Sequence, residues 1–103
     1  MSTLTKKIQD SISPNRAVEM LKEGNQRFLE KNEQDRDLHI QVSETSDGQF
    51  PYAVVLSCID SRVPVELVFD QGVGDIFSAR VAGNIINEDI LGSIESVSYT
   101  HLR

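Results

Sequence analysis

The sequence predicts an α/β fold, with an incomplete parallel β-sheet flanked by helices and a helical arm at the amino end. Residues 52–56 form an apolar run without alternation, which is typical of a strand covered on both faces in a parallel sheet. Residues 76–81 form a second strand-like run, and a short helix over 64–69 is expected between the two. A strand, a helix and a strand in this order indicate a βαβ unit.

The amino-terminal part is predicted to be helical. The first twelve residues are polar and without pattern, so we expect an arm that orders only against another surface. Ser13-Pro14 then begins a helix over 14–31, because serine can cap the first turn and proline is tolerated there. Gly24 interrupts this helix at a cost of about 1 kcal/mol relative to alanine. Residues 32–49 are expected to form a loop with at most one helical turn.

A final helix is predicted to begin near Asn87, with Ile90, Leu91 and Ile94 facing the core. Four carboxylates near the strands and this helix are interpreted as solvated or capping charges. They are Asp70, Asp75, Glu88 and Asp89.

Length and charge exclude several classes of protein. A chain of 103 residues accommodates one small domain. Ten basic and sixteen acidic residues give a net charge of −6, which argues against nucleic-acid or anionic-membrane partners. No apolar run is long enough to span a bilayer. A single cysteine excludes an intrachain disulfide and fits a reducing compartment, so we predict a cytoplasmic protein.

The chemistry is expected in residues 57–62, directly after the first strand, where open parallel sheets place their ligands. In one interpretation, Cys58 is a zinc ligand, because a thiolate is a preferred donor for Zn²⁺. Asp60 would reach the same metal or accept a hydrogen bond from metal-bound water. Arg62 would hold that carboxylate through two parallel hydrogen bonds and decide where it points.

Two other interpretations stay open from the residues alone. Cys58 could be a nucleophile whose pKa is lowered by Arg62, although a phosphatase loop is longer and no Cys-x-x-Cys pair is present. Alternatively, Cys58 could be a buried small hydrophobe next to a capped turn.

Several motifs together resemble the β-class carbonic anhydrases. Cys58-x-Asp60-Ser61-Arg62, followed by Val63-Pro64, resembles the first metal motif of that family. Residues 23–28 resemble its N-terminal helix, residues 74–84 the segment after the first motif, and residues 92–95 the start of its next helix. These motifs occur in the order that the family has.

The resemblance implies a zinc-dependent carbonic anhydrase (carbonate dehydratase, a lyase) that interconverts carbon dioxide and bicarbonate. It implies that Cys58 ligates Zn²⁺, and that Asp60 either occupies the fourth zinc position or swings away. Arg62 would be the partner that pulls Asp60 off the metal, so Asp60 and Arg62 would be the catalytic pair. Family members are typically dimers or larger, with the N-terminal helix lying across the neighbour, so a homo-oligomer is implied.

The sequence also departs from the family pattern. The family's further zinc ligands lie in a His-x-x-Cys motif, but Cys58 is the one cysteine and only two residues follow His101. We expect His101 to be a frayed terminal residue and His39 to be solvated.

We therefore expect residues 1–95 to form a partial β-carbonic anhydrase domain and residues 96–103 an atypical tail. The 103 residues are expected to be inactive alone. The alternative is a non-catalytic truncated module that associates with another chain.

Overall fold

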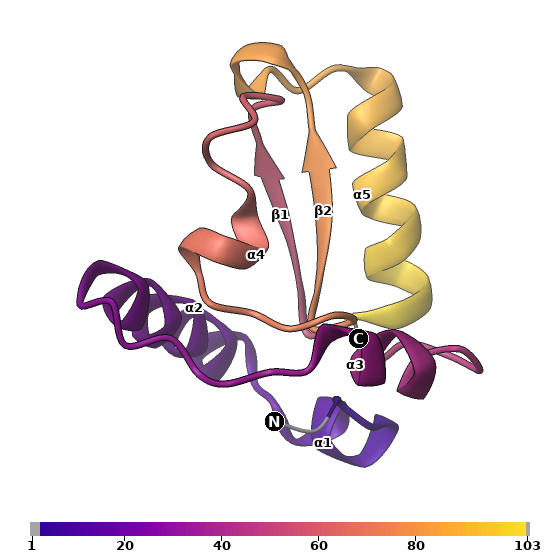
Figure 1. The fold of residues 1–103 in the computed structure, drawn as a ribbon. Coiled ribbons are helices and arrows are strands. Elements are labelled where there is room, and N and C mark those ends of the chain that lie inside the picture. Colours follow the sequence, from indigo (N-terminus) through magenta and orange to yellow (C-terminus); the bar gives the residue numbers. More distant parts are fainter. Residues whose placement is uncertain (1–2, 103) are drawn as a thin grey trace.

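Helices surround a two-stranded parallel sheet in the computed structural model, which describes residues 3–102 (Figure 1). Strand β1 spans Ala53–Ser57 and strand β2 spans Ile76–Arg80. Their register places Ala53 opposite Ile76 and Ser57 opposite Arg80. Because the strands are parallel, both carboxyl ends lie at one end of the molecule, as does the 3-10 turn η1 (Ala82–Asn84) that follows β2. The predicted α/β class and parallel sheet are confirmed.

Helix α2 (Pro14–Leu29) begins where the sequence predicted and ends two residues earlier. The Ser13 hydroxyl accepts a hydrogen bond from the Arg16 amide at 3.1 Å, which caps the first turn. Gly24 is buried, and a Cβ at this position would lie 1.7 Å from the Phe69 carbonyl oxygen. The interruption of the helical pattern is therefore a packing requirement. It allows α2 to approach the end of the short helix α4 (Val65–Val68).

The amino-terminal arm packs on its own chain through a short helix, α1 (Lys6–Ser11), capped by Thr5. The buried Gln9 side-chain amide donates to the Pro51 carbonyl at 2.6 Å and to the His101 carbonyl at 2.7 Å. For residues 3–12 the expectation that the arm orders only against another surface was wrong, and residues 1 and 2 lie outside the described residues. It missed these hydrogen bonds because Gln9 is separated by more than forty residues from both partners in sequence.

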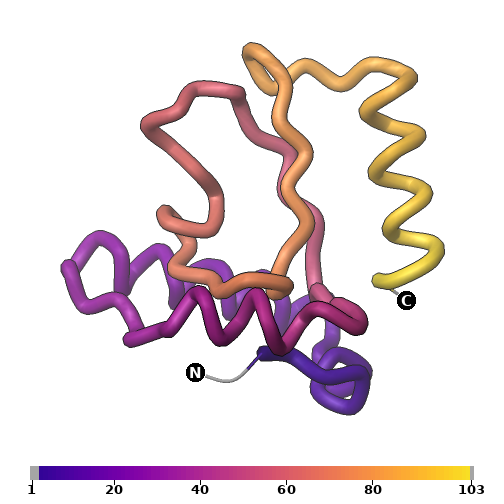
Figure 2. The backbone as a smooth tube through the Cα atoms, turned by 45° about the vertical axis from the view of Figure 1, so that its right-hand side comes forward, coloured from indigo at the N-terminus to yellow at the C-terminus, as the bar shows by residue number. Residues whose placement is uncertain are grey.

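The segment predicted as a loop contains helix α3 (Leu38–Glu44), which is longer than the expected single turn. The Asp37 carboxylate caps it by accepting from the Ile40 amide at 3.1 Å. Figure 2 shows α1, α2 and α3 together at the amino ends of the strands, away from the loops that follow them.

Helix α5 (Glu88–His101) runs beside β2 (Figures 1 and 2) and continues unbroken through residues 96–101. The Asn87 side chain caps it by accepting from the Ile90 amide at 2.9 Å. Ile90 and Ile94 are half-buried as predicted, but Leu91 is 44% exposed, so its assignment to the core was wrong. A pocket of about 110 Å³ lies between α5 and the sheet. Its lining includes Val54, Phe77, Ala79, Ile94 and Val97.

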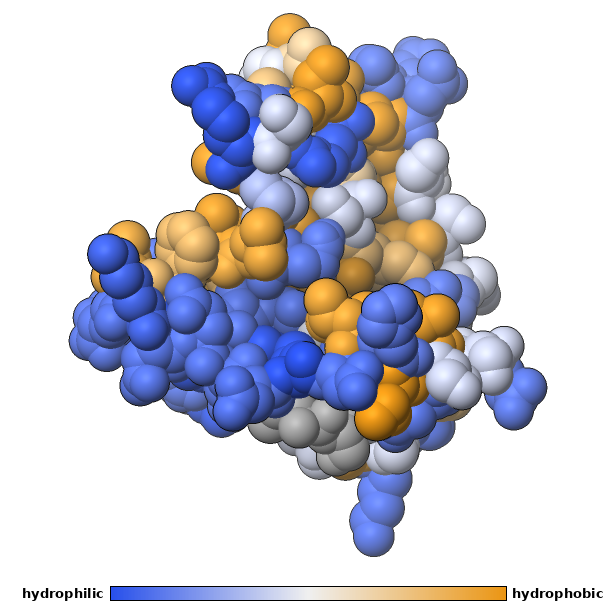
Figure 3. Space-filling view, viewed as in Figure 1, coloured by the Kyte–Doolittle hydropathy of each residue, from blue (hydrophilic) through white to orange (hydrophobic). Residues whose placement is uncertain are grey.

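The buried apolar core of the described residues is small and consists of Ala17, Tyr52, Val65 and Ile76. All five residues of β1 are only half-buried, so the expected cover on both faces of this strand is incomplete in the described residues. Apolar side chains also reach the surface around the carboxyl ends of the strands (Figure 3). These exposed residues are Ile59, Val63, Ile85 and Ile86. None of the helices within residues 3–102 is long and apolar enough to cross a membrane.

Candidate functional site

Cys58 follows β1 directly and lies in the loop 58–62 at the carboxyl end of the sheet. The turn after β2 approaches it, and the Gly83 amide donates to the Cys58 Sγ at 3.4 Å. Gly83 has φ 71°, a left-handed conformation that glycine adopts without steric cost. The pKa of the Cys58 thiol is lowered, first by this hydrogen bond from Gly83 and then by the backbone at Asp60. These hydrogen bonds stabilise the thiolate, the form that binds metals, more than in a free cysteine.

Asp60 is held by Arg62 within the same loop. The guanidinium donates from Nη2 to Oδ2 at 2.6 Å and from Nε to Oδ1 at 3.0 Å, and the Arg62 amide donates to Oδ1 at 2.9 Å. The pKa of the Asp60 carboxyl is lowered, mainly by the Arg62 side chain. Because the Arg62 side chain is 86% exposed, this pair orients the carboxylate more than it stabilises the fold.

Arg80 joins this site although the sequence analysis did not select it. It is the last residue of β2, and its Nε donates to the Cys58 carbonyl at 2.8 Å. Its Nη2 donates to the Asp60 carbonyl. The sequence did contain a usable signal, because the ends of parallel strands meet and Arg80 ends the second strand.

The described residues do not complete a zinc site. Cys58 and Asp60 can each provide a donor, but no group of three or more His, Cys, Asp or Glu within residues 3–102 could hold a metal ion. Catalytic zinc needs three protein ligands and an open position.

Neither histidine of the chain lies at this loop. His39 is exposed on α3, as expected. His101 is half-buried, and its ring packs edge-on against Phe77 at 5.3 Å between centroids. The expectation of a frayed terminal histidine was therefore wrong, because this ring contact and the hydrogen bond from Gln9 to the His101 carbonyl hold the residue.

Comparison with known proteins identifies the family of this chain. A family model described as carbonic anhydrase matches residues 53–102. Carbonic anhydrase 2 of Mycobacterium tuberculosis is 44% identical over 84 residues, which cover 81% of this chain and 41% of that protein. The carbonic anhydrase of Mycolicibacterium smegmatis is 43% identical over 84 residues, with the same two coverages. The solved structure of the β-carbonic anhydrase CcaA superposes with a TM-score of 0.54 at 27% identity, over 84% of this chain and 42% of that one.

The chain belongs to the β-class carbonic anhydrase family. It spans about 41% of the length of the mycobacterial relatives that it matches. The division of this β-carbonic anhydrase chain into residues 1–95 and an atypical tail stays a prediction.

A buried ion-pair cluster lies outside the site of this β-carbonic anhydrase chain. Asp70 is 5% exposed and accepts from Arg27 Nε at 2.6 Å, from Arg36 Nη1 at 2.5 Å and from the Gln34 amide at 3.0 Å. Burial alone would raise the pKa of Asp70, but the hydrogen bonds from these three groups outweigh it and lower the pKa. The interpretation of Asp70 as a solvated or capping charge was wrong, because two arginines distant in sequence enclose it.

The other three carboxylates agree with the interpretation as solvated or capping charges. Asp75 accepts from the Gly72 amide at 2.7 Å and so caps the turn before β2. Glu88 and Asp89 are exposed in the first turn of α5, where negative charge complements the helix dipole.

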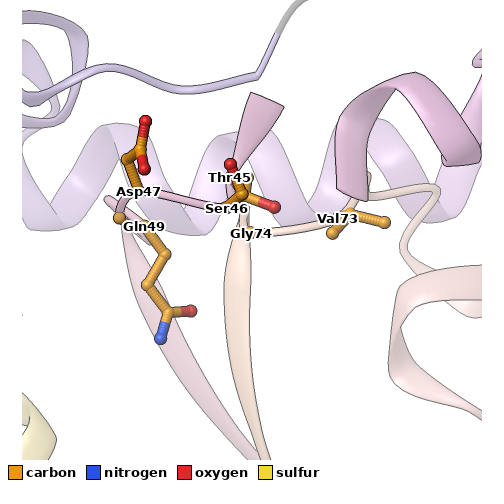
Figure 4. Close-up of a pocket in the computed structure, with 7 residues that line it drawn as sticks. Thr45, Ser46, Asp47, Gln49, Val73 and Gly74 are labelled. Atoms are coloured by element: carbon orange, nitrogen blue, oxygen red, sulfur yellow. The ribbon is translucent and has the colours of Figure 1, made fainter. Parts of the chain in front are cut away.

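A cavity of 410 Å³ lies at the opposite end of the sheet, between the turn after α3 and the start of β2 (Figure 4). Its lining includes the carboxylate of Asp47 but none of the candidate site residues. The loop 58–62, where a thiol and an oriented carboxylate lie together, stays the candidate site.

Proposed function

We propose that this chain carries part of the site at which a zinc-dependent carbonic anhydrase hydrates carbon dioxide reversibly to bicarbonate. In this proposal Cys58 is a zinc ligand, Asp60 is a second donor and Arg62 controls the position of Asp60. The observation that carries it is the two-point hydrogen bonding of Asp60 by Arg62, next to a cysteine whose pKa is lowered. Membership of the β-carbonic anhydrase family supports the same assignment.

The residues of this loop would have separate tasks. Cys58 would bind as a thiolate, supported by the hydrogen bond from the Gly83 amide. While Arg62 contacts both carboxylate oxygens, Asp60 is directed towards the guanidinium. Breaking these hydrogen bonds would free the carboxylate to bind the metal. When bound, zinc supplies a water whose pKa is lowered to about 7.

Two metal ligands do not complete a zinc site, so we assign no step of the reaction to the 103 residues alone. The resemblance to the family leads us to expect the remaining donors from a His-x-x-Cys motif. This sequence does not contain that motif. The homo-oligomeric state and the cytoplasmic location stay predictions.

A non-catalytic module that associates with another chain is the alternative. It is favoured by one observation: within the described part of the chain, no set of three potential ligands comes together. The two functions differ in what they require of Cys58, because a module has no need for a metal-binding thiol.

Zinc content and carbon dioxide hydration, measured on the same samples, test the proposal. One sample is the 103-residue chain. The other is a chimeric protein in which residues 1–95 precede the part of the Mycobacterium tuberculosis carbonic anhydrase 2 that follows the position aligned with residue 95. We expect neither zinc nor turnover in the first, and about one zinc per chain with turnover in the second.

The variant Cys58→Ser in the chimeric protein is the matched control, and it should lose turnover and bind zinc more weakly. A folded chimeric protein that binds no zinc would favour the module. Stoichiometric zinc with turnover in the 103-residue chain would exclude the module and would also contradict our expectation that the chain is inactive alone.

A further inference from the structure

We propose that Arg80 is a positioning residue, whose guanidinium fixes the backbone of the loop 58–62 relative to the end of β2. The relevance of Arg80 to hydration rests on the proposed function, whereas its action on the loop does not. Arg80 would touch neither substrate nor metal. It would act through the residues that carry the thiol and the carboxylate.

The contacts of Arg80 connect it to both of those residues. Its Nε donates to the Cys58 carbonyl at 2.8 Å and its Nη2 donates to the Asp60 carbonyl. The two carbonyls belong to alternate residues of one loop, and the planar guanidinium presents its donors in a rigid fork. One side chain therefore fixes the spacing between the backbones of Cys58 and Asp60, the two residues that would bind the metal.

Arg80 is well anchored for this task. It ends β2 opposite Ser57, the last residue of β1, and it is half-buried. The neighbouring Val81 amide donates to the Ser57 carbonyl at 2.9 Å, which holds the backbone of the two strand ends together. The Arg80 bonds extend this connection by up to three residues into the loop.

Other interactions of the loop act differently. Arg62 donates to the Asp60 carboxylate from its side chain and from its amide, within the same loop. Directly after the loop, the Val63 amide donates to the Asp60 carbonyl at 3.3 Å. The Gly83 amide contacts the Cys58 sulfur and not its backbone. The guanidinium of Arg80 thus holds the loop backbone from outside, and it leaves the Asp60 carboxylate to Arg62. Asp60 could change partner while its backbone stays fixed.

Amide hydrogen exchange of the metal-free 103-residue chain, followed by NMR, tests this inference in Arg80→Met and Arg80→Lys. In Arg80→Met we expect the Arg62 and Val63 amides to exchange about tenfold faster, because the loop opens more easily without its two external hydrogen bonds. The amides of the β1–β2 ladder should keep their rates. Lysine retains the charge but lacks the planar pair of N–H donors of a guanidinium. Arg80→Lys should therefore accelerate the exchange of the same amides, but less than Arg80→Met.

The matched control is Arg16→Met, which removes an exposed arginine that pairs with Glu19 and Glu23 on α2. It should leave the exchange of the loop unchanged. In the parent chain, the Arg80 Nε–H should exchange more slowly than the Arg62 Nε–H, whose side chain is exposed.

Unchanged loop amides in Arg80→Met would overturn the inference. Equal acceleration of the ladder and the loop would also overturn it, because that result indicates general destabilisation. If Arg80→Met does not fold, Arg80→Lys decides by the same comparison. Because no metal is present, the result is independent of whether the chain takes part in carbon dioxide hydration.

Discussion

At the scale of single residues, the candidate site depends on orientation and charge and gains little stability from its ion pair. The Asp60 side chain is 32% exposed and that of Arg62 is 86% exposed, and exposed pairs contribute about 0–1 kcal/mol. The four hydrogen bonds from Arg62 nevertheless determine where the carboxylate points. A change at Arg62 should therefore affect the site more than the fold.

Replacing Arg62 by glutamine should raise the pKa of Asp60 towards its ordinary value, because the Arg62 side chain is the main cause of the lowering. NMR titration of the Asp60 side-chain carboxyl measures this. The lowered pKa contributes stability that is present above the ordinary carboxyl pKa and is lost as the pH falls through the folded-state pKa. The variant should lack this contribution. Arg16→Gln is the control, and an Asp60 pKa that moves equally in both variants would contradict the assignment to Arg62.

At the scale of elements, two helical glycines show how local propensity and packing differ. Gly24 and Gly92 both lie inside helices, and alanine is preferred to glycine there by about 1 kcal/mol. A Cβ on Gly24 would collide with the Phe69 carbonyl, whereas a Cβ on Gly92 would meet nothing within 4 Å.

We predict that Gly24→Ala lowers the free energy of unfolding by at least about 2 kcal/mol, because α2 must move away from α4. In contrast, Gly92→Ala should raise it by about 0.5–1 kcal/mol. Urea denaturation of both variants measures the difference. Equal effects of the two substitutions would show that the close approach of α2 to Phe69 is incorrect.

The Asp70 cluster connects α2, the segment before α3 and the end of α4. Removing one partner of a buried ion pair costs about 3–5 kcal/mol, so Asp70→Asn should lower the free energy of unfolding by that amount. Because the pKa of Asp70 is lowered, its contribution is present at neutral pH and is lost as the pH falls through the folded-state pKa. The variant should therefore lose less stability on acidification than the parent chain.

Asp10→Asn is the control for this prediction, since its pair with Lys6 is more than half exposed and should contribute less than about 1 kcal/mol. Thermal unfolding of both variants at neutral and acidic pH makes the comparison. A loss for Asp70→Asn no larger than that for Asp10→Asn would contradict the buried cluster.

At the scale of the whole molecule, the sequence predicted what depends on neighbours in sequence. The helix starts at Ser13 and Asn87 were predictable because a capping side chain acts within three residues. The strands were predictable from their apolar runs. The candidate loop was also predictable, because the two residues that carry its ion pair are two positions apart.

The sequence did not predict the long-range polar contacts. Gln9 bonds to the His101 carbonyl across 92 positions, and Asp70 meets Arg27 across 43. For Arg80, the meeting of the two strand ends was a usable signal, but its hydrogen-bond partners in the loop depend on the strand register. Such contacts depend on how the elements pack, so a polar residue in a segment without pattern does not reveal its partner.

The coordination of zinc in the chimeric protein tests the central claim, that Cys58 is a ligand in a carbonic anhydrase site, most directly. X-ray absorption at the zinc edge counts sulfur neighbours at about 2.3 Å. We predict that zinc in the unmodified chimeric protein has one sulfur neighbour more than zinc in the zinc-loaded Cys58→Ser variant, because Cys58 provides that sulfur. A zinc-loaded chimeric protein whose sulfur shell is the same with and without Cys58 would contradict the claim.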